Sequence, residues 1–262
     1  MERIISLQNS RIKEAIRLRA KSGMRAERGM FPVEGRREIS MATRGGYSID
    51  SLFVCPELGA GCDFPADKVF EVDARVFEKI ACREDSDGLL ALVKMRERRL
   101  SDIRLTDVPL VIIVERVEKP GNLGAILRTA DAAGADAVVT CDPKCDWFNP
   151  NVIRSSLGCV FGVQIASCSP EEAFAWLRVN GIRSFAAELE ASNNYCSEDF
   201  TGASALIVGA EATGLGEFWL RNADRRIRIP MRGAVDSLNV SVSAAVITFE
   251  AVRQRTREND RG

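Results

Sequence analysis

The sequence contains no histidine among its 262 residues, and this absence excludes several kinds of site. A Ser-His-Asp triad, a Cys-His pair and a histidine-ligated metal all need the missing side chain. The commonest general base of enzymes is missing as well. Any proton transfer must therefore use Glu, Asp, Lys, Tyr, Cys, an unusual Arg, or water.

Cysteine pairs and long apolar runs are also missing. The eight cysteines include no C-x-x-C pair, and Cys141 and Cys145, four apart, have no second close pair to complete a zinc site. We therefore expect no metal and reduced thiols in a cytoplasmic protein. No run approaches the ~20 apolar residues of a membrane span. Residues 1–19 carry charges through their apolar positions, which is unlike a signal peptide and favours a protein without membrane contact.

The net charge of −1 hides an asymmetry along the chain. Residues 1–44 hold eleven Lys/Arg and five Glu, whereas residues 45–90 hold four Lys/Arg and ten Asp/Glu. A basic face on a nearly neutral protein is typical of a protein that binds a polyanion. A solvated helix surface explains the same pattern equally well.

The chain divides at a charged segment, residues 96–108, which we interpret as a linker between a domain of residues 1–95 and a domain of residues 109–262. The first part reads as a small α/β domain. Its expected helices are 11–21, capped by Asn9 or Ser10, and 36–43; its expected strands are 30–33, 51–54, 69–72 and 89–93.

Residues 109–262 alternate between strands and helices with short links, which predicts a mainly parallel sheet covered on both faces. The expected strands are 110–114, 137–140, 184–187, 205–208 and 227–229; the expected helices are 122–133, 170–176 and 237–252. Ligands of such sheets bind beyond the carboxyl ends of the strands. Three polar or Gly-rich segments follow strands there, 115–128, 209–216 and 230–239, so we expect them to converge.

The last segment, within IPMRGAVDSLNVSV at 229–242, holds more polar side chains than a helix start needs. Asp236 or Ser237 alone would cap the helix. Buried polar groups need partners, so the surplus indicates a ligand.

Two familiar loop motifs fit poorly. Residues 209–214 match the start of a phosphate loop but lack the following Lys and Ser/Thr, and residues 121–124 are not G-x-G-x-x-G. Tight turns at the glycines and an N-cap at Asn122 would give a purely structural account. That account leaves Arg128 unexplained, because the apolar pattern around it predicts a position where an unpaired charge is costly.

Three motifs in order carry a family resemblance: ERVEKPGNLGAILRTADAAGAD, LIVGAEATGLG and IRIPMRGAVDSLNVSVSAA. They resemble the SpoU/TrmH family of RNA 2′-O-ribose methyltransferases, in the SPOUT superfamily, over about residues 108–255. Residues 149–158 also resemble the family's segment between the first two motifs. The N-terminal part is similar, more loosely, to the family's ribosomal-protein-like substrate-binding domain.

The resemblance implies an α/β fold whose C-terminal domain is knotted as a deep trefoil, although connections in proteins rarely knot. It also implies S-adenosylmethionine as the cofactor, bound in the knot. By position, the cofactor-binding residues would be Gly209, Ile229 and Leu238, with Thr140, Met231 and Glu211 as neighbours.

The same resemblance assigns catalytic roles to Arg128, Asn122, Glu211, Ser237 and Asn239. Either Arg128 itself takes the proton of the 2′-hydroxyl, or it holds an RNA phosphate and stabilises the developing alkoxide while water or Glu211 takes the proton. Asn122, Ser237 and Asn239 would orient Arg128 and Glu211.

The implied partner is RNA, with ribosomal RNA favoured over transfer RNA because of the separate N-terminal domain. An RNA-binding assembly factor without activity is the alternative, although it would not need the catalytic set. RNA contacts are expected from basic residues at Arg11, Lys13, Arg17, Arg25, Arg36 and Arg37. The resemblance also implies a homodimer, in which Arg128 completes the partner's site. Val240, Ala244, Ile247 and Val252 would suit its interface, or would pack against the helix's own sheet.

Overall fold

The computed structural model describes residues 2–61, 63–83, 85–191 and 193–259. The chain forms two compact units. One comprises residues 1–97 with 146–162, and the other comprises residues 98–145 with 163–262. The division after residue 97 falls within the predicted linker, whereas the grouping of 146–162 with the N-terminal part was not predicted.

The first unit is built on a mixed five-stranded sheet in the order β1-β4-β3-β5-β2. Strand β5 runs antiparallel to both β2 and β3, and β4 runs parallel to β1 and β3. The strands are β1 Glu2–Ile4, β2 Met30–Glu34, β3 Ile49–Val54, β4 Ala66–Val72 and β5 Leu89–Lys94.

The helices of this unit include the two that were predicted. The Asn9 side chain caps the first of them by accepting from the Arg11 N–H at 2.8 Å. The helices are α1 Ser10–Ala20, α2 Ser22–Arg28, α3 Arg36–Arg44, α4 Ala74–Ile80 and α6 Pro150–Ser155, with 3₁₀ turns η1 Pro56–Leu58 and η3 Cys159–Phe161. Three of the helices and β1 are short, which is why their periodicity gave no signal.

Segment 146–162 joins this unit through aromatic packing. Phe148 stacks on Phe31 with ring centroids 4.1 Å apart, and Phe161 and Tyr47 meet edge to face at 5.3 Å. Such contacts add to the stabilisation from burying apolar area. They are made between residues far apart in sequence, so no local pattern announces them.

Arg25 was predicted to contact RNA, and the structure shows that this was wrong. Its side chain is only 3% exposed, and it pairs with Asp146 at 2.6 Å. It also donates to the Leu18 carbonyl at 2.6 Å. The charge is therefore used inside the unit, where it ties segment 146–162 to α1 and α2.

Arg25→Ala is expected to lower the free energy of unfolding by about 1–3 kcal/mol, because it removes the buried hydrogen bond to the Leu18 carbonyl and the ion pair with Asp146. Urea unfolding measures this loss. Arg28→Ala is the matched control, since Arg28 is 53% exposed and its pair with Glu14 should contribute little. Equal stability of the two variants would contradict the assignment.

The second unit is built on a parallel seven-stranded sheet in the order β10-β12-β9-β11-β6-β7-β8. This confirms the predicted α/β class and the mainly parallel sheet. The strands are β6 Leu110–Glu115, β7 Ala137–Cys141, β8 Ile165–Cys168, β9 Arg183–Ala187, β10 Asn193–Asn194, β11 Ser204–Val208 and β12 Arg225–Arg228.

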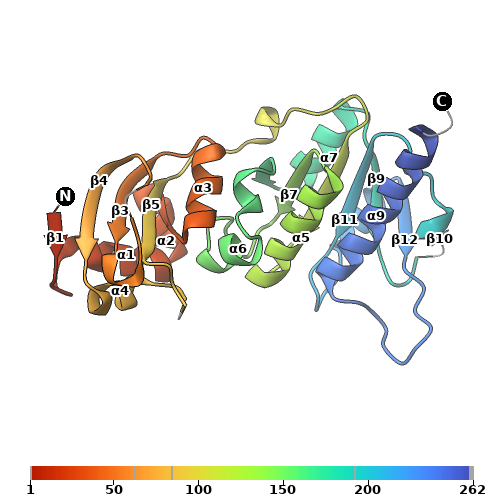
Figure 1. The fold of residues 1–262 in the computed structure, drawn as a ribbon. Helices are drawn as coiled ribbons and strands as arrows, with labels where there is room; N and C mark the ends of the chain where they lie inside the picture. Colours follow the sequence, from red (N-terminus) through yellow and green to blue (C-terminus); the bar gives the residue numbers. More distant parts are fainter. Residues whose placement is uncertain (1, 62, 84, 192, 260–262) are drawn as a thin grey trace. The chain divides into compact units, whose positions relative to one another are not determined.

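Helices cover both faces of this sheet (Figure 1). Alternate strand residues supply the two cores: Val111 and Ile113 pack with α7 and α8 on one face, while Leu110 and Leu206 pack with α9 on the other. Helix α5 packs beside α9. The helices are α5 Pro120–Ala133, α7 Pro170–Val179, α8 Glu217–Asn222 and α9 Val240–Asn259, with 3₁₀ turns η2 Leu100–Asp102 and η4 Tyr195–Ser197.

Two predicted helix starts need correction. Helix α5 begins at Pro120, so Asn122 lies in its first turn and is not its N-cap. Helix α9 begins at Val240, and Asn239 caps it by accepting from the Ser241 N–H at 2.9 Å. Asp236 and Ser237 are thus left in the preceding loop. None of the helices in the described ranges is long and apolar enough to cross a membrane.

Candidate functional site

A cavity of about 410 Å³ opens at the carboxyl ends of β9, β11 and β12 in the second unit. Its wall is largely apolar, with backbone groups and a few polar side chains, as is usual for small-molecule sites. Apart from Leu220 on α8, the lining residues belong to four segments, 187–190, 208–215, 227–231 and 237–243. Three of these segments overlap the predicted segments 209–216 and 230–239.

The loop after β11 owes its compact shape to two glycines. The Gly214 N–H donates to the Ala210 carbonyl at 2.8 Å, and Gly214 has a φ of +62°, which L-residues rarely adopt. A Cβ at Gly209 would overlap the backbone of Gly214 and Leu215. Only glycine at 209 therefore allows the loop to fold back on itself beside the cavity.

Asn122, Glu211 and Asn239 form a hydrogen-bonded set that joins the three predicted segments. The Asn122 amide N–H donates to the Glu211 carboxylate, and the Asn239 amide N–H donates to Asn122 Oδ1 at 3.1 Å. Asn239 Oδ1 accepts from the Ser241 hydroxyl at 2.7 Å. Because the same oxygen caps α9, the helix start fixes which way the Asn239 amide points. The expectation that the segments converge is thus confirmed.

Arg128 does not occupy the position that was predicted for it. Its side chain is exposed on α5, so the predicted conflict between a charge and a buried site does not arise. The apolar stripe of this helix faces the sheet through Leu123, Ile126, Leu127 and Ala130. No hydrogen bond or ion pair links Arg128 to Asn122, Glu211 or Asn239 within the described part of the chain.

The predicted cofactor residues lie in the cavity wall with one exception. Gly209, Ile229, Met231 and Leu238 all line it, and so do Glu211 and Ser237. Thr140 does not. It is buried in β7, and its hydroxyl is 2.8 Å from that of Ser167 on β8. Strand order explains the difference, since β6 separates β7 from the strands under the cavity.

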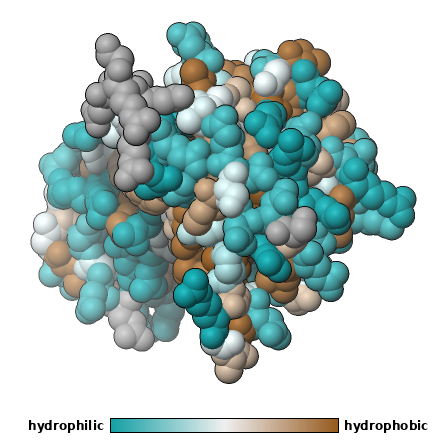
Figure 2. Space-filling view, turned by 90° about the vertical axis from the view of Figure 1, so that its right-hand side faces the viewer, coloured by the Kyte–Doolittle hydropathy of each residue, from teal (hydrophilic) through white to brown (hydrophobic). Residues whose placement is uncertain are grey.

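The segment after β9 was not predicted to be part of the site. Ala187, Glu188, Leu189 and Glu190 line the cavity and place two carboxylates in its wall. Their position at the end of a predicted parallel strand was the one indication of a role in the site. It was not sufficient, because only the strand order shows that β9 lies between β11 and β12. Figure 2 shows the side of the molecule that lies on the right in Figure 1, where hydrophilic side chains cover most of the visible surface between small apolar patches.

The predicted RNA contacts on the first unit fall into two groups. Lys13, Arg17 and Arg37 are exposed, and no hydrogen bond or ion pair engages their side chains in the described ranges. Arg36 pairs with Asp63, and Arg11 lies 3.8 Å from Glu14. The first group is thus available to a polyanion.

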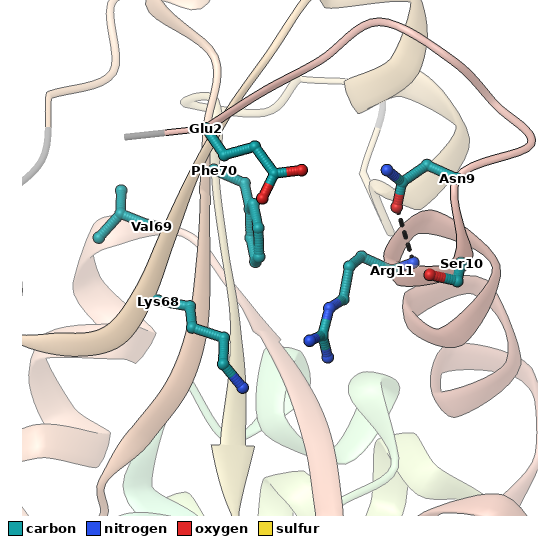
Figure 3. A pocket seen from close by; sticks show the side chains of 7 residues that line it. All are labelled: Glu2, Asn9, Ser10, Arg11, Lys68, Val69 and Phe70. Atoms are coloured by element: carbon teal, nitrogen blue, oxygen red, sulfur yellow. Dashed lines mark hydrogen bonds between the residues drawn. The ribbon is translucent and has the colours of Figure 1, made fainter.

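The first unit has a cavity of its own, of about 730 Å³, beside the start of α1. Arg11 and Lys68 extend from opposite sides toward the same space, and the Phe70 ring lies next to Glu2 at one end of it (Figure 3). The Arg11 guanidinium is 6.0 Å from the centre of that ring. The hollow is thus lined by two cations, the Glu2 carboxylate and an aromatic ring, together with Asn9 and Ser10.

Comparison with known proteins shows to which family the chain belongs. The profile of the SpoU rRNA Methylase family matches residues 109–249, which is more than half of the chain. The chain belongs to the SpoU rRNA methylase family. The profile of the MRM3-like substrate binding domain matches residues 9–91. Both parts of the sequence resemblance to SpoU enzymes are thereby confirmed.

Named SpoU relatives extend over almost the whole chain. The 23S rRNA (guanosine(2553)-2'-O)-methyltransferase RlmP of Bacillus subtilis is 28% identical over 250 residues, covering 95% of this chain and 98% of the relative. The 23S rRNA (uridine(2479)-2'-O)-methyltransferase of Streptomyces viridochromogenes is 29% identical over 266 residues, covering 97% and 93%.

Solved structures agree. An AdoMet-bound rRNA methyltransferase from Sinorhizobium meliloti superimposes with a TM-score of 0.87 at 30% identity, covering 96% of this chain and 97% of that one. A crystal structure of an RNA 2'-O ribose methyltransferase gives 0.84 at 38% identity, covering 97% and 99%. The similarity to these methyltransferase structures thus extends over both units.

Proposed function

We propose that this chain transfers a methyl group from S-adenosylmethionine to a ribose 2′-hydroxyl of ribosomal RNA, in the cytoplasm. The observation that carries the proposal is the cavity itself: in a SpoU chain, it adjoins the hydrogen-bonded set of Asn122, Glu211 and Asn239. Relatives named for 2′-O-methylation of 23S rRNA support the substrate. The domain boundaries at 95 and 109 belong to the same proposal.

The cavity suits the cofactor. Its volume of about 410 Å³ is within the usual range for small-molecule sites. Val208, Ile227, Ile229 and Leu238 give it apolar walls for an adenine ring, and the backbone that Gly209 leaves uncovered can donate and accept at the ring edge. When bound there, S-adenosylmethionine supplies a methyl group on a sulfonium centre.

The protein's own residues align the ribose 2′-hydroxyl and accept its proton. Asn239 fixes Asn122, and Asn122 fixes the Glu211 carboxylate at the cavity wall. Glu211 is therefore the side chain held ready to accept the proton of the 2′-hydroxyl. Alignment of the hydroxyl oxygen with the reacting carbon can supply about 7–11 kcal/mol of the rate acceleration.

Arg128 acts from a second copy of the chain in this proposal. It is exposed, and within the described part of one chain it forms no ion pair with Glu211. Helix α9, which packs beside its helix α5, has exposed apolar side chains at Val242 and Phe249. These two, and not Val240, Ala244 and Ile247, which are buried within the unit, would form the dimer interface. The guanidinium would hold an RNA phosphate near the 2′-oxygen and stabilise its developing charge.

The deep trefoil knot is also part of the proposal. Residues 229–239 form no helix or strand between β12 and α9, yet they lie along the cavity with the loop after β11. A chain that passed through the loop there would hold both walls of the site together.

Calorimetry with S-adenosylmethionine tests the proposed function. We expect saturable binding, and we expect Ser237 and Leu238 variants to weaken it, because both side chains line the cavity. Lack of binding at millimolar cofactor would overturn the proposal in favour of an RNA-binding factor without activity.

The first unit would hold the RNA through its exposed cations. Replacing both Lys13 and Arg17 by alanine is expected to weaken RNA binding about tenfold at low salt. It should also reduce the slope of log K against log salt by about 1.4, since each phosphate contact with single-stranded RNA contributes about 0.7. Filter binding across a salt series measures both.

The control for that experiment lies on α4. Arg75 and Lys79 have the same i,i+4 spacing and are also exposed, but they lie in the acidic stretch of the sequence. Their double alanine variant should bind RNA like the wild type. An equal loss of RNA affinity in both variants would show that binding depends on the net charge of the protein and not on a particular face.

A further inference from the structure

Glu115 is a buried carboxylate that the roles proposed so far leave unused. It is the last residue of β6, and only 2% of it is exposed. An ionised carboxylate in such a position is costly unless it is hydrogen-bonded or paired. Its hydrogen bond to the loop after β11 shows how this cost is offset.

The Glu115 carboxylate bonds the far end of the loop that lines the cavity. Glu115 Oε2 accepts from the Gly216 N–H at 2.5 Å, and Gly216 directly follows the lining segment 208–215. Strands β6 and β11 pair with Val114 opposite Val208, so the next residues along, Glu115 and Gly209, lie side by side. The side chain therefore bridges the start and the end of the loop.

The packing around this bond leaves little freedom. A Cβ at Gly216 would come within 2.6 Å of Glu115 Oε1. Arg116, whose backbone has a φ of +52°, places its Nη2 atom 3.6 Å from Glu115 Oε2 and partly balances the charge. Gly216 itself has a φ of −67°, which any residue can adopt, so the nearby Glu115 carboxylate and Arg116 guanidinium, and not the backbone, favour glycine there.

We propose that Glu115 is a positioning residue for cofactor binding: it holds the 209–216 loop closed, and with it Gly209 and Glu211. The inference rests on the proposed function of the cavity. Glu115 does not line the cavity and touches no reacting atom in this proposal. It acts through the Gly216 amide.

Steady-state kinetics of Glu115→Ala test the proposal. We expect the KM for S-adenosylmethionine to rise at least about tenfold and kcat to fall less, since the loop is loosened but keeps its side chains. Glu115→Gln retains an oxygen that can accept from the Gly216 N–H, so its KM should stay within about threefold of wild type. Gly216→Ala pushes against the carboxylate from the other side and should raise KM as Glu115→Ala does.

Asp224 provides a matched control at the opposite end of the sheet. Its carboxylate accepts from the Ser184 N–H at 2.9 Å and hydroxyl at 2.7 Å, next to the starts of β9 and β12. Asp224→Ala should lower the melting temperature without changing the KM for the cofactor. This comparison separates loop positioning from a general loss of stability.

The outcomes are distinct. A cofactor KM that is unchanged in both Glu115→Ala and Gly216→Ala, or that rises equally in Asp224→Ala, would overturn the inference while the wild type remains active. If Glu115→Ala fails to fold, the cofactor KM values of Gly216→Ala and Glu115→Gln still test the inference. A wild type that neither binds nor uses S-adenosylmethionine would instead overturn the proposed function.

Discussion

Replacing Gly209 by alanine is expected to weaken S-adenosylmethionine binding by at least ~100-fold, or about 2.7 kcal/mol. The added Cβ would overlap the backbone of Gly214 and Leu215, and neither can move without opening the loop. Gly209 does not have a positive φ, so alanine introduces no strain of its own there. The loss would come from the displaced cavity wall, and calorimetry measures it directly.

Gly202→Ala is the control for this variant. Gly202 is exposed shortly before β11, and a Cβ there would meet nothing within 4 Å. It should therefore bind the cofactor like the wild type. Binding by Gly209→Ala within threefold of wild type would mean that the loop after β11 does not form the cofactor site.

Arg128→Ala is expected to lower kcat about 10²–10³-fold, the usual cost of losing a group that stabilises developing charge. Arg128→Lys distinguishes the two roles left open by the sequence. Lysine keeps the charge, so a phosphate clamp should retain part of the activity with a wild-type pH profile. A lysine that acted as the base would have to be deprotonated, and the rate would climb with pH toward 10.

Subunit mixing tests where Arg128 acts. Neither Arg128→Ala nor Glu211→Ala should be active alone. A mixed dimer would contain one site with both residues intact if Arg128 reaches the partner's site, so activity should return on mixing. No recovery would place Arg128 in the site of its own chain. Wild-type activity of Arg128→Lys at every pH together with wild-type activity of Arg128→Ala would remove both roles.

The sequence predicted those parts of the fold that depend on local patterns. Leu110–Val114 is continuously apolar and mostly β-branched, because both faces of its strand are covered. The Ser169-Pro170 start of α7 forms a capping box with Glu172. The rim of the sheet could be predicted as well, since carboxyl ends of parallel strands lie together.

The errors concern contacts between residues far apart in sequence. Arg25 looked like other exposed cations until Asp146, 121 residues away, was seen to pair with it. Thr140 was predicted to lie near the cofactor and does not line the cavity, whereas Glu188 was not predicted and does. Both errors arise because the order of strands in a sheet cannot be predicted from the residues of a single strand. The surplus of polar groups at 229–242 did indicate a site, but the cap proved to be Asn239, which serves the helix and Asn122 at once.

Mapping 2′-O-methyl groups in total RNA from cells with and without this protein tests whether the chain methylates ribosomal RNA. We expect one ribose methylation in 23S rRNA to be lost without the protein, and we expect the wild type to restore it and a Glu211→Ala variant not to. An unchanged map of ribosomal RNA, or a change confined to transfer RNA, would contradict this expectation.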